Sequence, residues 1–394
     1  MANSLGVGIV GALLGAGLIG ALVVAGPLDP PSGPVSSTYK TLGDVEPRVA
    51  VNGTNTPGDA DSVFKITQPG SYYLTGDIVG QSAKHGIEIA SSLVTLDLNG
   101  FRVVGTAGSK SGIVAGIAEN TTVRNGTVHG WGDSGVSLLT SARSCVEDVS
   151  SVGNTQFGIA VGLTSTVRRC NVANNGNGIR GGFWCVISEC QVRESGSMGI
   201  FCEGQAIVSS CLVQGSGAVG VHASGYGNLV SDCTVSDSSS AGILAESASR
   251  VVNCQSNFNQ GDGIQCPGNG STVENCGATL NSGNGISVGS DCTVRLNNCR
   301  ENGFNDGAGI LVAGTNNRIE ENNCLWADRG VHVTGTGNFI VRNTCSQNTA
   351  DWVFAANNVY GPIRDRRAPG SPAINSFDAP GSLGTAEANA NFSY

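Results

Sequence analysis

The chain has 394 residues, of which 59 are glycine, 14 are cysteine and only 13% are charged, and its formal net charge is −9. An acidic chain lacks the basic face that nucleic-acid binding requires, so no nucleic-acid partner is expected. The abundance of glycine and the scarcity of long charged side chains favour a protein built from strands and turns over a helical one.

The N-terminal residues 4–25 form an uncharged run of apolar residues and glycine. With Val23 and Ala25 before Gly26, the run resembles a signal peptide and its cleavage site, which predicts a secreted or periplasmic protein, with association to the cell surface as an extension. The first four residues carry no Lys or Arg, and about twenty apolar residues can also span a bilayer. A retained membrane anchor is therefore the alternative, and only in that case does the chain contact a membrane.

The following residues divide into a linker, a folded region and a tail. Residues 26–58 are rich in Pro, Gly, Ser and Thr and are predicted to be a linker. Residues 59–363 are predicted to form the folded region, and the aromatic-rich stretch 59–80 suits a cap over otherwise unpaired strand edges. Residues 364–394, rich in Ala, Gly, Pro and Asn, are predicted to be a C-terminal tail.

From Gly135 to Val353 a glycine followed by Ile or Val recurs every twenty to twenty-four residues, with a cysteine between consecutive copies. The glycines are Gly135, Gly158, Gly178, Gly199, Gly220, Gly242, Gly263, Gly285, Gly309 and Gly330, and the cysteines are Cys145, Cys170, Cys190, Cys211, Cys233, Cys254, Cys276, Cys299, Cys324 and Cys345. Two marks with one period indicate a solenoid. Each period holds three short alternating runs separated by Asn- and Gly-rich turns, which is strand periodicity. The pattern predicts an all-β, single-stranded parallel β-helix of about 13 coils, spaced by about 4.8 Å and capped at both ends.

The cysteines are predicted to point into the helix as small apolar residues. Ten share one offset in the repeat, and Cys185, Cys202, Cys266 and Cys292 fall at other fixed offsets. Parallel Cβ vectors on stacked coils suit a disulfide poorly, and buried free cysteine is common. No Cys-x-x-Cys pair occurs and the four histidines are scattered, so no metal site is predicted.

Asparagines accompany the cysteines and are predicted to form ladders that satisfy buried amides. They are Asn253, Asn275, Asn297, Asn298, Asn322, Asn323 and Asn343.

Several phrases resemble known proteins. LDLNGF (residues 96–101), VRNGTV (residues 123–128) and the Gly-Ile repeats resemble right-handed parallel β-helix repeat proteins, the superfamily of pectate lyases, polygalacturonases and NosD-type periplasmic proteins. More narrowly, residues 55–78 and 84–101 are similar to exported planctomycete β-helix proteins of unassigned function. The resemblance covers residues 26–361 and, with the crossover rule for parallel strands, implies a right-handed helix.

Enzymes of this superfamily act on polysaccharides, and the resemblance implies motifs that can be sought. The Asp-Asp, Gly-His-Gly and Arg-x-Lys patterns of polygalacturonases do not occur in the late coils. A pectate-lyase-like site needs acidic side chains around calcium and an arginine base. Glu189 and Asp232 are the weak catalytic candidates, two coils or about 10 Å apart in one column, with Arg168 near them in sequence and Ser210 between them. Calcium is a cofactor only under this alternative, and no other cofactor is expected.

A candidate ligand-binding face comes from the residue that follows each Gly-Ile or Gly-Val pair. On three successive coils these residues are Arg180, Phe201 and His222, and Trp184 and Tyr226 lie in corners that could flank them. Arginine, histidine and aromatic rings on one face suit a saccharide, although an ordinary mixed surface has the same composition.

The leading hypothesis is a non-catalytic exported β-helix protein with a structural or carbohydrate-contacting role at the cell surface or in the periplasm, with polysaccharide as its partner. A polysaccharide lyase or glycoside hydrolase with an unrecognised site is one alternative. A surface adhesion or assembly module is the other. The sequence predicts no oligomeric state.

Overall fold

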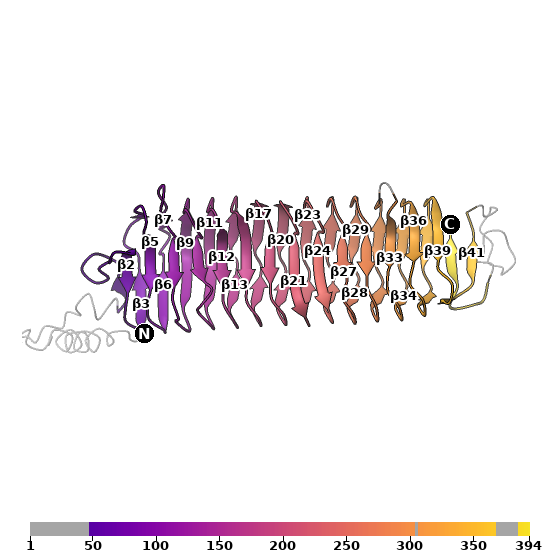
Figure 1. Ribbon diagram of the computed structural model, residues 1–394, viewed down its shortest axis with the longest axis horizontal. Helices are drawn as coiled ribbons and strands as arrows, with labels where there is room; N and C mark the ends of the chain where they lie inside the picture. Colours follow the sequence, from indigo (N-terminus) through magenta and orange to yellow (C-terminus); the bar gives the residue numbers. More distant parts are fainter. Residues whose placement is uncertain (1–46, 304–305, 368–384) are drawn as a thin grey trace, which may run out of the picture. The chain divides into compact units, whose positions relative to one another are not determined.

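The computed structural model describes residues 47–303, 306–367 and 385–394 (Figure 1). The chain divides into two units at Pro47, and the description concerns the second unit, Arg48–Tyr394. The predicted signal peptide and most of the predicted linker lie outside the described residues. The described ranges contain no helix with the length and hydropathy needed to cross a bilayer.

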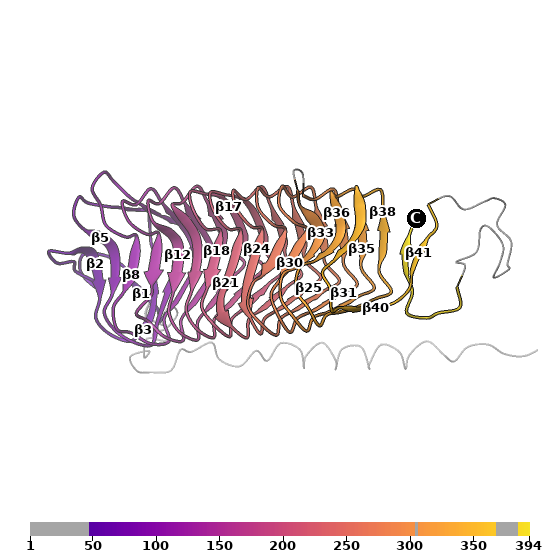
Figure 2. The same ribbon diagram turned by 45° about the vertical axis from the view of Figure 1, so that its right-hand side comes forward.

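The second unit is a stack of 14 coils of parallel strands, which confirms the predicted all-β parallel β-helix (Figures 1 and 2). One strand of each coil belongs to a 14-stranded sheet, the first sheet. The other strands form a 28-stranded sheet that folds into two ladders, which we call the second and third ladders and which share β9 and β11. Each strand pairs with the equivalent strands of the preceding and following coils. Consecutive strands within one coil therefore lie on different faces.

The first sheet contains β2 (Ser62–Ile66), β5 (His85–Ile89), β8 (Ile113–Ala115), β10 (Val136–Leu138), β12 (Phe157–Val161), β15 (Asn177–Gly181), β18 (Ile200–Cys202), β21 (Val221–Tyr226), β24 (Ile243–Ser247), β27 (Ile264–Cys266), β30 (Ile286–Val288), β33 (Ala308–Val312), β36 (Arg329–Val333) and β39 (Ala350–Phe354). The second ladder contains β1 (Val49–Ala50), β3 (Gly70–Tyr73), β6 (Val94–Asp97), β9 (Thr122–His129), β11 (Cys145–Val152), β13 (Thr166–Arg168), β16 (Val186–Ser188), β19 (Ile207–Ser209), β22 (Leu229–Ser231), β25 (Arg250–Val252), β28 (Thr272–Glu274), β31 (Thr293–Arg295), β34 (Arg318–Glu320), β37 (Phe339–Val341) and β40 (Val359–Tyr360). The third ladder contains β4 (Ile78–Val79), β7 (Arg102–Val104), β9, β11, β14 (Asn171–Ala173), β17 (Gln191–Ser195), β20 (Leu212–Ser216), β23 (Thr234–Ser236), β26 (Gln255–Asn257), β29 (Gly277–Thr279), β32 (Asn298–Arg300), β35 (Asn323–Leu325), β38 (Thr344–Ser346), β42 (Asn391–Ser393) and β41 (Ile363–Asp365).

The repeat glycine is required because the coils approach one another closely where the first sheet begins. A Cβ on Gly178 would lie 2.2 Å from the carbonyl oxygen of Gly199, and a Cβ on Gly199 would lie 2.6 Å from that of Gly220. No other residue fits such an approach without moving the backbone of the next coil. The glycine therefore fixes the register, and the Ile or Val that follows it points into the core, as the fully buried Ile200 and Val221 do.

The interior is filled by aliphatic residues and by thiols. All 14 cysteines are free and 13 of them are buried, as predicted. The exception is Cys145, which lies in register with Thr122 and Thr166 and is only partly buried. The ladder position in that coil is taken by Val149, because Ser150 is in register with Asn171, which follows Cys170.

The cysteines predicted at one offset form two columns instead. Cys170, Cys190, Cys211, Cys233, Cys254 and Cys276 make the first column, and Cys299, Cys324 and Cys345 make a second one. The second column continues from Ala278, two residues further along the coil, since Ala278 is in register with Cys299.

Asparagine takes over the first column where cysteine stops. The oxygen Oδ1 of Asn297 accepts a hydrogen bond from the backbone N–H of Cys276 at 2.9 Å, and Asn322, Asn343 and Asn391 continue the column. Thiol and amide make corresponding bonds: Cys276 Sγ donates to the Val251 carbonyl at 3.7 Å and Asn297 Nδ2 to the Val273 carbonyl at 3.0 Å. The predicted asparagine ladder is therefore confirmed: Asn297, Asn322 and Asn343 continue the first cysteine column, whereas Asn275 lies beside that column and donates to Asn253 Oδ1 at 2.8 Å.

Both ends of the stack use residues outside the repeats. At the N-terminal end the stretch before β2 folds back, forming an antiparallel bridge between Pro57 and Phe64. At the C-terminal end β42 pairs with β38 and β41, and its Asn391 completes the amide column. The end of the predicted tail thus adds a strand to the stack.

Candidate functional site

The outward residues of the first sheet form a continuous row, which we call the outer row. It runs in register through Arg180, Phe201, His222, Leu244, Gln265, Ser287, Leu311 and His332. These are the residues that the sequence placed on one stripe, because each follows a buried Ile or Val by one position on a pleated strand.

Three of the predicted ligand-binding residues touch in sequence order along this row. The Arg180 guanidinium lies 6.0 Å from the centroid of the Phe201 ring. The rings of Phe201 and His222 meet edge to face, with centroids 5.3 Å apart and an interplanar angle of 76°. The aromatic ring is therefore held between a cation and an imidazole on three consecutive coils.

The other two predicted residues lie at the corner that follows the first sheet. Trp184 is 53% exposed and Tyr226 is 57% exposed. The indole N–H of Trp184 donates to Gln205, and the backbone N–H of Gln205 donates to the carbonyl of Tyr226 at 2.9 Å. The two aromatic residues therefore flank one coil, the coil that carries Phe201.

Two carboxylates that the sequence reasoning missed complete the group. Glu203 lies 3.2 Å from the Arg180 guanidinium, and Glu246 lies 3.3 Å from His222 Nε2. Partial burial works against ionisation, but hydrogen bonds from the Gly225 backbone N–H and from His222 hold the pKa of Glu246 below its usual value. We call the seven residues the central patch: Arg180, Trp184, Phe201, Glu203, His222, Tyr226 and Glu246.

The central patch combines apolar faces with hydrogen-bonding groups of balanced charge. Aromatic rings offer flat apolar surface, while the paired carboxylates, arginine and histidine offer donors and acceptors. Because Glu203 neutralises Arg180, the patch presents no excess of positive charge. A sugar ring, which has C–H faces and a rim of hydroxyls, matches this combination.

The predicted catalytic candidates do not come together. Glu189 and Asp232 occupy one corner column, with Ser210 between them, and all three have left-handed backbone conformations. Asp232 accepts a hydrogen bond from Asn253 at 3.1 Å. The Arg168 guanidinium forms an ion pair with Glu147 at 2.5 Å rather than with either of the two candidates.

No calcium ligand set accompanies these residues. Across the described ranges, no three His, Cys, Asp or Glu side chains gather in a way that could hold a metal ion. The residues present therefore do not fit the calcium-dependent lyase alternative at the predicted place.

A cleft of about 410 Å³ hollows the same face nearer to the C-terminal end, and we call it the outer cleft. It is lined by Ser282, Gly283, Asn284, Asp306, Gly307, Leu311, Arg329, His332 and Thr334. Leu311 and His332 belong to the outer row, Arg329 begins β36, and the remaining residues come from the turns that lead into β30 and β33 and out of β36. The sequence reasoning placed Leu311 and His332 on the stripe but did not identify a cleft there.

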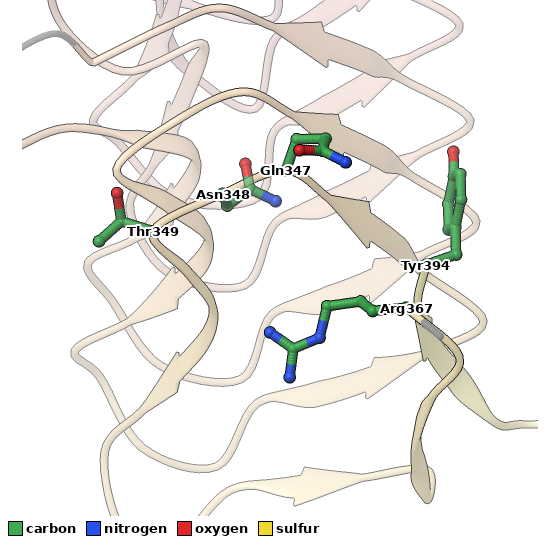
Figure 3. A pocket seen from close by; sticks show the side chains of 5 residues that line it. All are labelled: Gln347, Asn348, Thr349, Arg367 and Tyr394. Carbon is green, nitrogen blue, oxygen red and sulfur yellow. The ribbon is translucent and has the colours of Figure 1, made fainter. Parts of the chain in front are cut away.

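Two further hollows lie at the ends of the stack. The N-terminal one, about 270 Å³, contains Lys65, whose ammonium group lies 2.8 Å from both Asp59 and Glu88. The C-terminal one, about 320 Å³, is shown in Figure 3, where the Arg367 side chain extends toward the turn that carries Asn348. Arg367 is paired with Asp365. The positive charges of Lys65 and Arg367 are therefore both neutralised by carboxylates.

Three solved structures have folds similar to that of this chain. The A-module of Mannuronan C-5 epimerase AlgE4 from Azotobacter vinelandii is 12% identical with a TM-score of 0.57, covering 74% of this chain and 91% of that one. The AlgE6 A-module from the same organism is 14% identical with a TM-score of 0.53, covering 74% and 89%. A mutant of the tailspike protein of E. coli bacteriophage HK620 is 14% identical with a TM-score of 0.55, covering 92% and 81%. At these identities the likeness shows the fold.

Comparison with family models indicates the same fold. A search of curated proteins found no match. The family model for the right handed beta helix region, in contrast, matches residues 85–230, 185–300 and 224–361. Since these matches cover most of the chain and coincide with the stacked coils, the chain belongs to the right-handed β-helix family.

Proposed function

We propose that this protein binds carbohydrate through the central patch, without converting it, as an exported protein at the cell surface or in the periplasm. The observation that carries the proposal is the unbroken contact of Arg180, Phe201 and His222 along the outer row. The names of the similar structures support a role in contact with sugars. Export rests on the signal-like residues 4–25 alone.

A non-catalytic role is favoured by the way the charged groups are used. Arg180 and His222 each face a carboxylate within the patch, and Arg168 is paired with Glu147. An acid or base that is to act on a substrate must reach the proton that it transfers. The groups of the patch instead hold one another in place and leave the aromatic ring between them.

The test is a screen of glycan binding and polysaccharide depolymerisation by the full-length chain, with and without calcium. The triple variant Arg180→Ala, Phe201→Ala, His222→Ala is expected to lose at least tenfold in affinity, since aromatic contacts contribute about 0.5–1.5 kcal/mol and hydrogen bonds to charged groups about 1.5–3 kcal/mol. The matched control is the double variant Val114→Ala, Ser137→Ala, which changes residues of β8 and β10 that continue the register of the outer row beyond Arg180 and lie outside the patch. Equal binding by the triple variant and the wild type would refute the assignment of the patch.

The enzymatic alternative has one observation in its favour. His222 and Glu246 form a hydrogen-bonded pair that also contacts Ser224 and the Gly225 backbone, and such a pair can exchange a proton with a bound sugar. Cleavage in the same screen, abolished by Glu246→Gln while binding persists, would establish a lyase or hydrolase instead. Binding with no change in the size of the polysaccharide is the result expected for a non-catalytic protein.

The adhesion or assembly alternative is supported by apolar residues at the C-terminal end of the stack. Val359 and Tyr360 of β40 are 64% and 52% exposed. Light scattering over a range of protein concentrations distinguishes the alternatives: a mass that rises with concentration and falls in Val359→Lys, Tyr360→Lys favours assembly through this end.

A further inference from the structure

The outer cleft offers uncharged surroundings although charged residues line it. Arg329 binds the Asp306 side chain and, through Nη1, the Asp306 carbonyl at 2.9 Å. Asn284 donates from its backbone and its side chain to Asp262 Oδ1, at 2.7 and 2.9 Å. The two charged residues that line the cleft, Asp306 and Arg329, thus neutralise each other, and Asp262 is met by amide donors alone, so the cleft carries no uncompensated positive charge.

His332 gives the cleft an unused hydrogen-bonding group. Burial and the neighbouring Arg329 guanidinium lower the pKa of His332, so the ring is neutral at pH 7 and carries one donor and one acceptor. No hydrogen bond joins this ring to any other described residue, in contrast to His222 and its partner Glu246. Leu311, its neighbour in the outer row, adds an apolar floor.

The outer row between the central patch and the outer cleft carries no charge. Leu244, Gln265 and Ser287 follow His222 on successive coils, and Leu311 and His332 follow them. With coils about 4.8 Å apart, His222 and His332 are separated by five coil steps, about 24 Å. A straight track of uncharged residues therefore joins two places that carry hydrogen-bonding groups beside an apolar side chain.

We propose that the outer cleft is a second sugar site and that one linear, uncharged glycan occupies the central patch and the cleft together. The inference rests on the proposed function, because it takes the central patch to be a sugar site. It goes further in naming the ligand class: among the described residues of the central patch and the outer cleft, Arg180 and Arg329 are each paired with a carboxylate and so are not free for a uronate chain, and the net charge of −9 opposes a polyanion. A ligand that reaches both sites binds the second one intramolecularly, at high effective concentration.

The test is titration calorimetry of the full-length chain with cello-, xylo- and manno-oligosaccharides, each as the trimer and as a chain of about ten units, which can reach both sites. Two trimers per protein chain but one long oligosaccharide are expected for the series that binds, with at least tenfold tighter binding of the long form. Oligomannuronate of the same lengths, with and without calcium, is expected to bind at least tenfold more weakly than the neutral series.

The variant Leu311→Asp places a carboxylate in the cleft, and Ser137→Asp places one on β10, in register with Arg180 through Ala160 and outside both sites. Leu311→Asp is expected to leave one trimer site and to reduce the affinity for the long chain to that for the trimer, and His332→Ala is expected to weaken long-chain binding in the same direction. Ser137→Asp is expected to bind like the wild type, and circular dichroism verifies the fold of each variant.

The outcomes separate this inference from the proposed function. One trimer per chain in the wild type, or long-chain affinity unchanged in Leu311→Asp, overturns the second site while leaving the central patch intact. Stronger binding of oligomannuronate overturns the uncharged ligand class. If the triple variant Arg180→Ala, Phe201→Ala, His222→Ala still binds two trimers, the central patch is not a sugar site.

Discussion

Replacing Asn322 by leucine should destabilise the stack strongly, although the two side chains have similar size. Asn322 is buried, and its Oδ1 accepts from the backbone N–H and Nδ2 of Asn297 at 3.0 and 2.9 Å. Its Nδ2 donates to the Val294 carbonyl and to Asn343 Oδ1, both at 2.9 Å. Leucine removes all four bonds and leaves the Asn297 N–H without its acceptor.

The magnitude follows from the partners that remain. Asn297 Nδ2 keeps its bond to the Val273 carbonyl and Asn343 Oδ1 keeps the Asn322 backbone N–H. A stranded backbone N–H costs about 1–3 kcal/mol and each bond donated by the lost amide about 0.5–1.5 kcal/mol, so Asn322→Leu should lower the free energy of unfolding by about 2–6 kcal/mol. Asn322→Cys should lose less, because a thiol there can donate to the Val294 carbonyl as Cys276 does to Val251.

Urea unfolding followed by circular dichroism measures the effect. The matched control is Asn298→Leu, an exposed ladder asparagine whose Oδ1 receives one long bond, 3.2 Å, from Asn323. A surface substitution of this kind should stay within about 0.5 kcal/mol of the wild type. If Asn322→Leu costs no more than Asn298→Leu, the amide column does not stabilise the stack and the reasoning is refuted.

Three further predictions concern glycine, thiols and a partly buried carboxylate. Gly178→Ala should lower the melting temperature clearly, because overpacking costs about 1–3 kcal/mol. Gly116→Ala, with nothing within 4 Å of the new Cβ, should not lower it. Equal melting temperatures of the two variants would contradict the requirement for glycine at position 178. N-ethylmaleimide should label at most Cys145 in the native chain and all 14 cysteines after unfolding, because the other 13 thiols are buried; for Cys185, burial also raises the pKa to about 12 and so disfavours the reactive thiolate. Labelling that persists in Cys145→Ser would count against this. Burial raises the pKa of Asp262, so its ionised form destabilises the folded chain above that pKa, and this penalty fades as the pH falls. Asp262→Asn should therefore have a higher melting temperature than the wild type at pH 7 and lose this difference at pH 4. A difference in melting temperature that grew toward low pH would contradict the reasoning.

The fold and the outer row could be predicted because they depend on one short, rigid unit. The distance in sequence from Gly178 to Arg180 is the same as from Gly199 to Phe201 and from Gly220 to His222. A pleated strand without a bulge between the two positions turns that constant offset into a constant direction. The sequence therefore indicated which residues line one face before any partner was known.

The remaining features depend on atoms that meet across coils. Cys276 and Asn297 make equivalent hydrogen bonds, so asparagine replaces cysteine in the first column. The repeated cysteine then lies two residues further along the coil, at Cys299, without any break in the fold. Glu203 and Glu246 each lie four residues after a repeat glycine, Gly199 and Gly242, but only the stacking shows that they face Arg180 and His222 on neighbouring coils. The offset alone does not reveal these partners.

The outer cleft and the core near the N-terminal end depart from the repeat for reasons of space. The cleft adjoins the longest interval between repeat glycines, Gly285 to Gly309, where the extra residues bring Asp306 to Arg329. Trp131, which looks in the sequence like a corner aromatic, is buried and donates to the Val103 carbonyl at 3.0 Å. It fits because glycines such as Gly80 leave room where a Cβ would lie 2.7 Å from the indole.

The passage from thiols to amides in one column gives the stack two mechanical regimes. Amides that donate and accept in the same direction polarise one another, and each added coil strengthens the bonds already made. Weak thiol donors carry little of that mutual polarisation. The coils from Cys190 to Cys233 are therefore held mainly by aliphatic contact and strand pairing, whereas those from Asn297 onward are also tied by a directional chain of dipoles that ends in Asn391. A force that pulls the coils apart along the stack should open the thiol segment first and leave the amide segment closed.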